Sequence, residues 1–317
     1  MAVGRCEVSG KTGNTMRANP QLSIVIADTG RADEIETCLR GLVIQARGKR
    51  TEIIVTHRRH DGSMAALEAA YPDVAFVSPS AEANLPMLLE EGIAKSSGEI
   101  IAITDASCAT DDRWLASILE AHRSAGPVVG GAVEPASLVK LLDWAAYFCD
   151  YGQFMRPLEE GAAGEVPGNN FSFKRWALGE GESAGLNTPG GFWKSHWCNR
   201  LRQQGFELML TPSIMLRSGR TYRLIPFLRR RFHHARCFAG MRLEQASIGR
   251  RLLYLVGSPF LPFLFFARLV RKITPKHKYL REFVLSTPLI AAAVTSWSVG
   301  EFCGYLCGAG RSCTHVY

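Results

Sequence analysis

The sequence predicts an α/β domain with a mostly parallel sheet, followed by helices that associate with a membrane. Short apolar, β-branched runs alternate with helix-patterned segments between residues 22 and 133, as in sheets that carry helices on both faces. The chain has 317 residues, enough for one large domain and an appendage, and its apolar fraction of 47% excludes a disordered chain. Beyond Arg217 the composition becomes arginine-rich and then apolar.

Each element of the alternating part follows from its own residue pattern. The first run, residues 22–27, is apolar, and the segment after it carries Ile35, Leu39 and Leu42 at helical spacing. The same reasoning gives the later elements. The expected strands are residues 22–27, 52–56, 74–77, 99–104 and 128–133, and the expected helices are residues 32–45, 64–70, 85–95 and 114–124.

The carboxyl ends of these strands are the expected place for a ligand. Three of those ends carry polar residues, at positions 27–31, 56–61 and 105–108. We therefore expect these three loops to converge on one binding pocket.

The charge of the chain is uneven. Residues 217–281 hold 16 Lys and Arg but one acid, Glu244, so this stretch carries +15 of a net charge of +8 and the rest sums to −7. Such a segment requires an anionic partner. The apolar stretches that follow favour a membrane or nucleotide phosphates over nucleic acid.

Two apolar stretches, residues 252–267 and 283–299, suggest membrane association. Both are shorter than the roughly 20 residues of a spanning helix. The basic loop 268–281 between them would violate the positive-inside rule if both stretches spanned. We therefore expect the first stretch to dip in and return or to lie in the interface, and two helices of a soluble core are the alternative. The expected organisation is a flexible leader (1–20), the α/β domain (21–216), basic amphipathic interface helices (217–251), membrane-associated helices (252–310) and a tail (311–317).

The cysteines and the first residues suggest a cytosolic setting. The nine cysteines are dispersed and form no CxxC pair, which predicts reduced thiols rather than a zinc site. Residues 1–20 are polar and lack the apolar core of a signal peptide.

Several motifs, in order and spacing, resemble those of family 2 glycosyltransferases. They cover about residues 22–242. The matching segments are residues 23–27 (SIVIA) followed by Arg31, residues 52–55 (EIIV), residues 98–105 (GEIIAITD), residues 128–131 (VVGG), residues 166–173 (VPGNNFSF) and Arg200-Leu201. The resemblance implies a GT-A fold, a UDP- or GDP-sugar donor and a divalent cation such as Mg²⁺ or Mn²⁺.

The resemblance places donor-binding residues at the first two strand ends. Ala27, Asp28 and Arg31 follow the first strand, and His57 stands where the family has an acid. Asp61 lies close enough to replace that acid. Alternatively, Arg58 and Arg59 bind phosphate directly, or this second strand end is a solvated basic loop.

The metal position of the family corresponds to Asp105-Ala106-Ser107. The family has two acids that flank one residue, and here Ser107 replaces the second acid. One carboxylate, a hydroxyl and the donor phosphates would hold a cation more weakly than two carboxylates. Alternatively, Asp105 only caps the following turn.

The catalytic-base position corresponds to Lys194, where similar sequences have Glu after Phe-Trp. An ammonium group is not a base unless its pKa is lowered. Lys194 is therefore a candidate ligand of the leaving diphosphate, and His196 is the nearest alternative base. Trp193 is expected to stack on a sugar or to pack the pocket floor.

Two further segments are expected to reach the donor. Gly168 permits close backbone approach, and Asn169 or Asn170 can hydrogen-bond sugar hydroxyls; an ordinary turn is the alternative. Arg231 and Arg236 belong to an arginine-rich helix that resembles one near the donor diphosphate in membrane-attached members. A basic surface helix attracted to anionic lipid is the alternative.

Together these features predict a glycosyltransferase at the cytoplasmic face of a membrane. It would move a sugar from a nucleotide-diphospho-sugar to a lipid-linked or saccharide acceptor. Because Ser107 and Lys194 replace acids, the alternative is a catalytically degenerate relative that binds nucleotide sugar or lipid and regulates a partner enzyme. Nucleic acid is not an expected partner.

Overall fold

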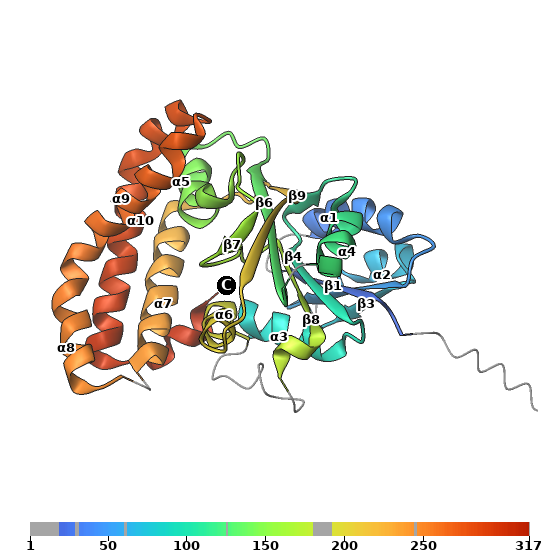
Figure 1. Cartoon of the computed structure of the whole chain (residues 1–317), viewed down its shortest axis with the longest axis horizontal. Helices are drawn as coiled ribbons and strands as arrows, with labels where there is room; N and C mark the ends of the chain where they lie inside the picture. Colours follow the sequence, from blue (N-terminus) through green and yellow to red (C-terminus); the bar gives the residue numbers. More distant parts are fainter. Residues whose placement is uncertain are drawn as a thin grey trace, which may run out of the picture.

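A computed structural model of the chain describes residues 19–28, 32–59, 62–124, 126–179, 192–243 and 246–316. Its centre is a sheet that has nine strands within these ranges, with helices on both sides (Figure 1). The strands are β1 (Leu22–Asp28), β2 (Thr51–His57), β3 (Val74–Val77), β4 (Ile100–Asp105), β5 (Cys108–Thr110), β6 (Val128–Pro135), β7 (Gly161–Ala163), β8 (Phe171–Lys174) and β9 (Leu208–Ser218).

The sheet is mostly parallel, as predicted. Its order is β3-β2-β1-β4-β8-β6-β9-β5, with β7 paired to β9. Strands β1 to β4 pair in parallel, and so do β6 and β9. Strand β8 runs antiparallel to both β4 and β6, a reversal that the alternating pattern did not predict.

Helices cover both faces of the sheet, which confirms the predicted class. On one face, α1 (Ala32–Ala46), α2 (Ala65–Ala70) and α4 (Trp114–Ser124) bury apolar residues such as Leu39 and Trp114 against the strands. On the other face, α3 (Leu85–Lys95) and α6 (Lys194–Gln203) do the same through Leu88 and Trp197. The residues of β1 are all buried, which explains its continuous apolar pattern.

A helical layer lies beside the carboxyl edge of the sheet (Figure 1). It contains α5 (Leu141–Asp150), α7 (Leu224–Leu243), α8 (Ile248–Gly257), α9 (Leu261–Ile273) and α10 (Leu280–Cys307), and short 3-10 helices link or follow the larger elements. These are η1 (Gly152–Phe154), η2 (Arg175–Leu178), η3 (Ser258–Phe260), η4 (Thr274–Lys276) and η5 (Gly310–His315). Helix α5 was not predicted.

Helices α7 and α10 pack closely because α10 has glycines at their contact. A Cβ on Gly300 would lie 2.3 Å from the carbonyl oxygen of Phe232, and one on Gly304 would lie 2.7 Å from that of Arg236. Both helical segments beyond α7 are longer than the apolar stretches predicted from the sequence. Residues Ile248–Lys276 and Leu280–Cys307 are long and apolar enough to cross a membrane, and 6% and 39% of their most apolar windows are buried.

The C-terminal segment is not a loose tail. Cys237 of α7 and Cys313 form a disulfide, in contrast to the expectation of reduced thiols. The side-chain amide of Asn84 donates a hydrogen bond to the carbonyl oxygen of Cys313 at 2.7 Å, and Val316 is buried. Segment 310–316 therefore ties α7 to the start of α3.

Candidate functional site

The three predicted strand ends meet at one edge of the sheet. Ala27 pairs with Thr56 on one side and with Asp105 on the other, and Asp28 pairs with His57. The register of β1, β2 and β4 therefore brings together the loops that sequence analysis expected to converge.

A cavity of about 980 Å³ lies between this edge and the helical layer. It is large enough for a nucleotide sugar, because ligand pockets measure roughly 300–1,000 Å³. Of the predicted site residues, six line it: Ala27, Asp105, Gly168, Asn169, Lys194 and Arg231. Within the described ranges, the other predicted residues lie outside its lining: Asp28, His57, Ser107, Asn170, Trp193, His196 and Arg236. Arg31 and Asp61 lie outside the described residues.

Asp105 and Ser107 form a tight turn rather than a pair of metal ligands. The backbone N–H of Ser107 donates to Oδ1 of Asp105 at 2.8 Å, and its hydroxyl donates to the same oxygen at 2.5 Å. Cys108 adds a weaker S–H contact at 3.7 Å. In the described part of the chain, no three His, Cys, Asp or Glu side chains gather as a metal site would require. The protein thus supplies one carboxylate here, and this set alone does not fit a divalent cation.

Lys194 begins α6 and points into the cavity floor. Its Nζ donates to the carbonyl oxygen of Val166, and burial lowers the pKa of its ammonium group. Lys194 therefore fixes the loop that carries Gly168, in addition to lining the cavity.

Trp193 and His196 lie behind the cavity lining. Trp193 is 5% exposed, and its ring meets the edge of His234 at a centroid distance of 5.1 Å. The His196 ring packs against Phe238 at 5.3 Å. Of the three predicted catalytic residues, only Lys194 lines the cavity.

The two adjacent asparagines differ in role. Asn170 is fully buried: its amide donates to the carbonyl oxygens of Ala132 and Ile214, and its Oδ1 accepts from the indole N–H of Trp114. It therefore holds the sheet together where β6 and β9 shift register. Asn169 lines the cavity, and its buried Oδ1 has no hydrogen-bond partner among the described residues. Such an atom calls for a ligand donor or water.

The ends of β1 and β2 form a buried polar layer at the carboxyl edge of the sheet. Asp28 is 2% exposed and accepts from Nε of Arg59 at 3.3 Å. His57 is 3% exposed, and its Nδ1 accepts from the backbone N–H of Arg59 at 3.2 Å. Both side chains thus brace the loop after β2, at the correct edge of the sheet but outside the cavity lining.

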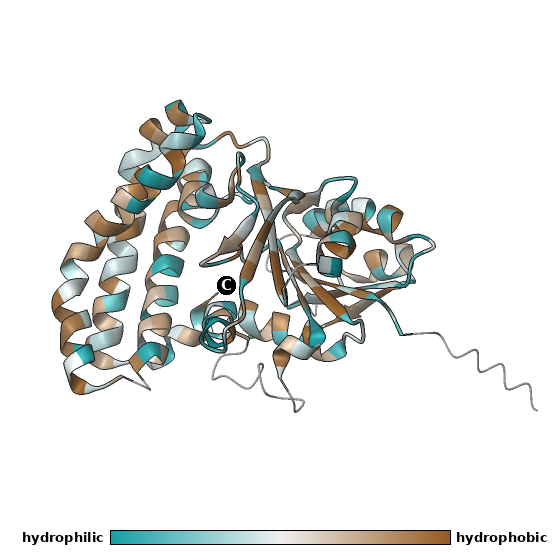
Figure 2. Cartoon of the chain, in the orientation of Figure 1, coloured by the Kyte–Doolittle hydropathy of each residue, from teal (hydrophilic) through white to brown (hydrophobic). Residues whose placement is uncertain are grey.

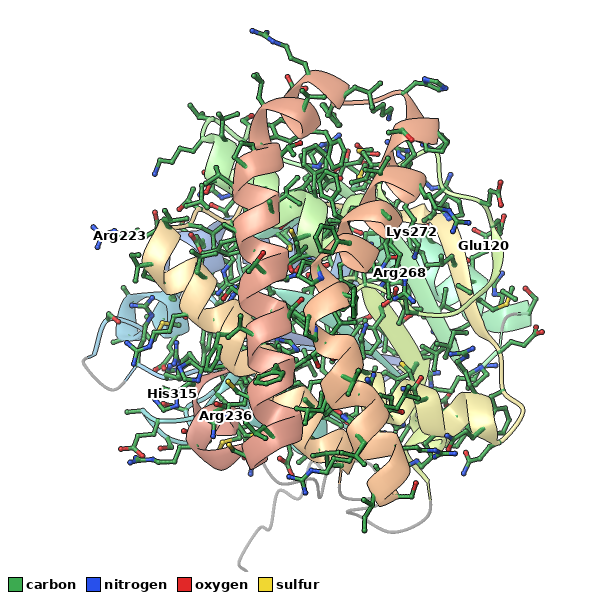
Figure 3. All side chains as sticks on the ribbon, turned by 90° about the vertical axis from the view of Figure 1, so that its left-hand side faces the viewer. Glu120, Arg223, Arg236, Arg268, Lys272 and His315 are labelled. Atoms are coloured by element: carbon green, nitrogen blue, oxygen red, sulfur yellow. A yellow bond between two sulfur atoms is a disulfide. The ribbon has the colours of Figure 1, made fainter. Side chains whose placement is uncertain are left out.

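The helical wall carries the positive charge of the cavity. Arg230 and Arg231 of α7 hold Asp150 of α5 between them, at 3.3 Å and 2.5 Å. Burial lowers the pKa of Arg230, but the neighbouring Tyr222 and Asp150 raise it by more. The net pKa therefore lies above the ordinary value of an arginine, and the guanidinium stays charged. Arg220 lines the same wall. Arg236 lies elsewhere, where its Nε donates to the carbonyl oxygen of Gly308 near His315 (Figure 3).

Sequence analysis missed several cavity residues, because α5 and the position of α9 were not foreseen. Helix α9 contributes a wall that is apolar at Leu261, Leu264 and Phe265 and basic at Arg268 and Lys272. Figure 3 shows the last two on one side of α9. These five positions share one face of a helix, because they follow the spacing of three or four residues that a helical face requires. This spacing was the signal in the sequence that could have identified the wall.

Four carboxylates line the cavity, and they differ in how strongly neighbouring side chains hold them and in how exposed they are. Asp150 is held by two arginines, and Glu301 accepts from the indole N–H of Trp297 and the hydroxyl of Tyr305. Asp105 is held by Ser107. The Glu165 side chain accepts from the amide of Gln153 at 2.8 Å and lies 3.8 Å from Nζ of Lys272, but it is 57% exposed, more than the carboxylate of Asp150 (21%). Glu165 is therefore the cavity carboxylate best able to meet an incoming ligand.

Comparison with known proteins identifies the fold. No protein-family profile and no curated protein sequence matches the chain. The mannosyltransferase PcManGT from Pyrobaculum calidifontis, solved with GDP-Man and Mn²⁺, is 16% identical over 92% of this chain and 88% of its own, with a TM-score of 0.56. TarS residues 1–349 from S. aureus are 10% identical over 89% and 90% (TM-score 0.48), and GalNAc-T7 with UDP, GalNAc and Mn²⁺ is 12% identical over 64% and 44% (TM-score 0.45). The likeness to PcManGT shows that this chain has the GT-A glycosyltransferase fold.

Proposed function

We propose that the protein is a family 2 glycosyltransferase that moves a sugar from a UDP- or GDP-sugar to an acceptor at the cytoplasmic face of a membrane. One observation carries this proposal: in a GT-A fold, the cavity at the carboxyl edge of the sheet faces a wall that carries Arg230 and Arg231, whose side chains are 15% and 13% exposed. A nucleoside diphosphate is the ligand that matches this edge and this charge.

The arginines of α7 would stabilise the leaving diphosphate. Negative charge grows on that group as the sugar departs, and fixed cations in a water-poor site stabilise it. Arg230 and Arg231 are positioned for this role because Asp150 fixes their guanidinium groups. Mg²⁺ or Mn²⁺ was the expectation from sequence, but Asp105 is a single carboxylate, so we assign this role to the arginines.

The donor sugar and the acceptor would lie on either side of the diphosphate that the arginines of α7 hold. Gly168 and the unpartnered Oδ1 of Asn169 offer room and a hydrogen-bond acceptor for the donor sugar. The apolar half of α9, at Leu261 and Leu264, favours a lipid-linked acceptor over a free saccharide. Glu165 would remove the proton of the acceptor hydroxyl, as a carboxylate at the cavity wall is suited to do.

The alternative is a degenerate protein that binds nucleotide sugar or lipid and regulates a partner. Lys194 favours this alternative, because it stands at the base position of the family and is engaged with Val166. Membrane preparations given labelled UDP- and GDP-sugars decide between the two. Transfer by the wild type that Asp105→Ala abolishes supports the enzyme. Transfer that appears only in Lys194→Glu supports the alternative.

A further inference from the structure

The last helices form a hairpin, in which residues Ile248–Lys276 run back along Leu280–Cys307. Length and composition alone allow each arm to cross a bilayer. Figure 3 views this hairpin from outside, with both arms lying across the rest of the molecule. Its contacts determine how it can meet a membrane.

One face of α10 is buried along almost the whole helix. Phe283 packs on Phe148 of α5 near one end, Ala293 is fully buried in the middle, and Tyr305 is 1% exposed near the other end. These residues span about 33 Å at 1.5 Å per residue, roughly the thickness of the hydrocarbon core. If α10 crossed the bilayer, α5, α7 and the polar cavity beside it would have to lie in the hydrocarbon as well. Charged side chains such as Arg230 and Arg231, which line that cavity, make such a position costly.

Both ends of the hairpin are fixed to the catalytic domain. At the turn, Lys276 donates to the carbonyl oxygens of Met155 and Pro157, and Lys278 lies 3.7 Å from the buried Glu134. At the opposite end, the segment after α10 is held by Asn84 through the carbonyl oxygen of Cys313. A spanning hairpin would place these two anchors on opposite sides of the membrane, yet both belong to one domain.

The outer face of the hairpin is apolar and exposed. Its exposed stripe on α8 and α9 recurs every three or four residues, as one helical face requires. Its members are Ile248, Leu252, Val256, Phe260 and Phe263, which are between 56% and 80% exposed. Figure 2 shows hydrophobic residues along both helices. We call these five residues the hairpin stripe.

The charges around the stripe identify what covers it. Residues 217–281 carry +15, and Arg250 and Arg271 lie on the same two helices as exposed side chains. A second copy of this basic surface would be repelled, whereas anionic lipid headgroups would be attracted at about 1 kcal/mol per basic residue. An apolar stripe with basic neighbours is the pattern of a helix that lies in the membrane interface.

We propose that the hairpin lies flat in one leaflet of an anionic membrane, with the hairpin stripe embedded, and does not cross the bilayer. The α9 wall of the cavity then borders the lipid, because Leu264 both lines the cavity and is 47% exposed. This orientation deepens the proposed function, since a lipid-linked acceptor would enter the cavity beside α9 without leaving the membrane.

Vesicle flotation of the purified full chain tests the embedded face. We expect the wild type to float with vesicles of phosphatidylcholine and phosphatidylglycerol and to float less with phosphatidylcholine alone. Phe263→Glu should weaken partitioning about tenfold or more, because it removes a large apolar side chain from the interface. The control is Ile44→Glu on α1, a residue that is 62% exposed on a face away from the hairpin; it should float like the wild type. Equal loss in both variants, or a wild type that forms dimers and does not float, would overturn the proposal.

Cysteine labelling in membrane vesicles tests the orientation. The two reporters are native Cys307, which is exposed at the end of α10, and a cysteine at the turn made by His277→Cys with Cys307→Ser. If both reporters lie on the same side of the membrane, an impermeant maleimide should label both of them in vesicles of one orientation and neither of them in vesicles of the opposite orientation. Labelling in opposite orientations would mean that α10 spans and would refute the flat hairpin. Neither experiment measures sugar transfer, so the failure of this orientation and the failure of the proposed enzyme activity are separable.

Discussion

The two walls of the cavity differ in charge and in origin. The strand wall comes from β1, β4 and the loop before β8, and it presents carboxylates, amides and backbone. The helical wall comes from α5, α7, α9 and α10, and it presents Arg230, Arg231 and Arg268 beside the already bonded carboxylates of Asp150 and Glu301. The strand wall has Asp105 and Ser107 where the resemblance to family 2 glycosyltransferases implies two acids, while the helical wall holds fixed cations. In the function that we propose, charge compensation therefore belongs to the helices and acid–base chemistry to the strand wall.

The largest effect on the rate of sugar transfer is expected at Glu165, the proposed general base on the strand wall. Glu165→Gln keeps the size of the side chain and removes its ability to accept a proton, so we expect transfer to fall by about 10²–10⁴-fold. The assay is the initial rate with the labelled donor sugar. Glu159→Gln, outside the cavity lining and on the same connecting segment, is the control. A loss of less than about tenfold would remove Glu165 from the base role.

The next effect tests the helical wall. Arg231→Gln removes a fixed cation while Arg230 still pairs with Asp150, so we expect transfer to fall by about 10²–10³-fold. Arg231→Lys should recover part of the loss. Arg229→Gln changes an exposed neighbour on the same helix and should leave the rate unchanged. If Arg229→Gln and Arg231→Gln are equally impaired, the loss reflects α7 as a whole and not the cavity wall.

A smaller effect is expected from restoring the acid that the strand wall lacks. Ser107→Asp places a second carboxylate two positions from Asp105, and we expect Mn²⁺ to bind this variant on the order of tenfold more tightly than the wild type, as measured by Mn²⁺ titration of the purified proteins. Ser107→Ala serves as the control, because it removes the hydroxyl without adding charge. Wild-type activity that EDTA already abolishes and Mn²⁺ restores would show that the strand wall holds a cation without this acid.

The smallest effect concerns stability in acid, to which two histidines contribute: His122 of α4, which is buried, and His234 of α7, which lines the cavity. Burial and the neighbouring Arg231 and Arg230 lower the pKa of His234 to about 3, and burial with Lys174 lowers that of His122 to about 4. Both groups bind protons more readily in the unfolded chain, so stability falls as the pH drops below about 6.5. Each should cost about 2 kcal/mol at about pH 5.

Urea unfolding at neutral pH and at about pH 5 checks this prediction. His234→Gln should remove about half of the acid-induced loss that the two histidines cause, because His122 remains. A variant with the full wild-type loss would show that His234 keeps an ordinary pKa and that the helical wall is more hydrated than its arginines imply.

The strand wall was largely predictable, and the helical wall was not. Apolar runs such as that of β1 and the register of parallel strands made the meeting of Ala27, His57 and Asp105 predictable. Whether a side chain faces the cavity depends on packing across the sheet, so His57 and Asn170 proved to be bracing residues. Arg231 was anticipated through the family resemblance, but Glu165 and Asp150 depend on the fold of residues 141–165, for which the sequence pattern gave no prediction.

The disulfide between Cys237 and Cys313 is another feature that could not be predicted from the sequence, because it depends on the fold. Cys237 and Cys313 are separated by 76 residues, and their contact exists because α10 returns the chain to α7. Cysteine spacing alone does not reveal such a pair.

The most direct test of the account is whether a nucleotide fills this cavity. Gly168 lines it, and a Cβ added there meets no atom within 4 Å, so Gly168→Trp should fold and obstruct the space. Gly164→Trp on the same loop also meets no atom within 4 Å and lies outside the cavity lining, which makes it the matched control. We predict that UDP or GDP raises the melting temperature of the wild type and of Gly164→Trp but not that of Gly168→Trp. An equal rise in all three proteins, or no rise with either nucleotide in the wild type, would contradict the account.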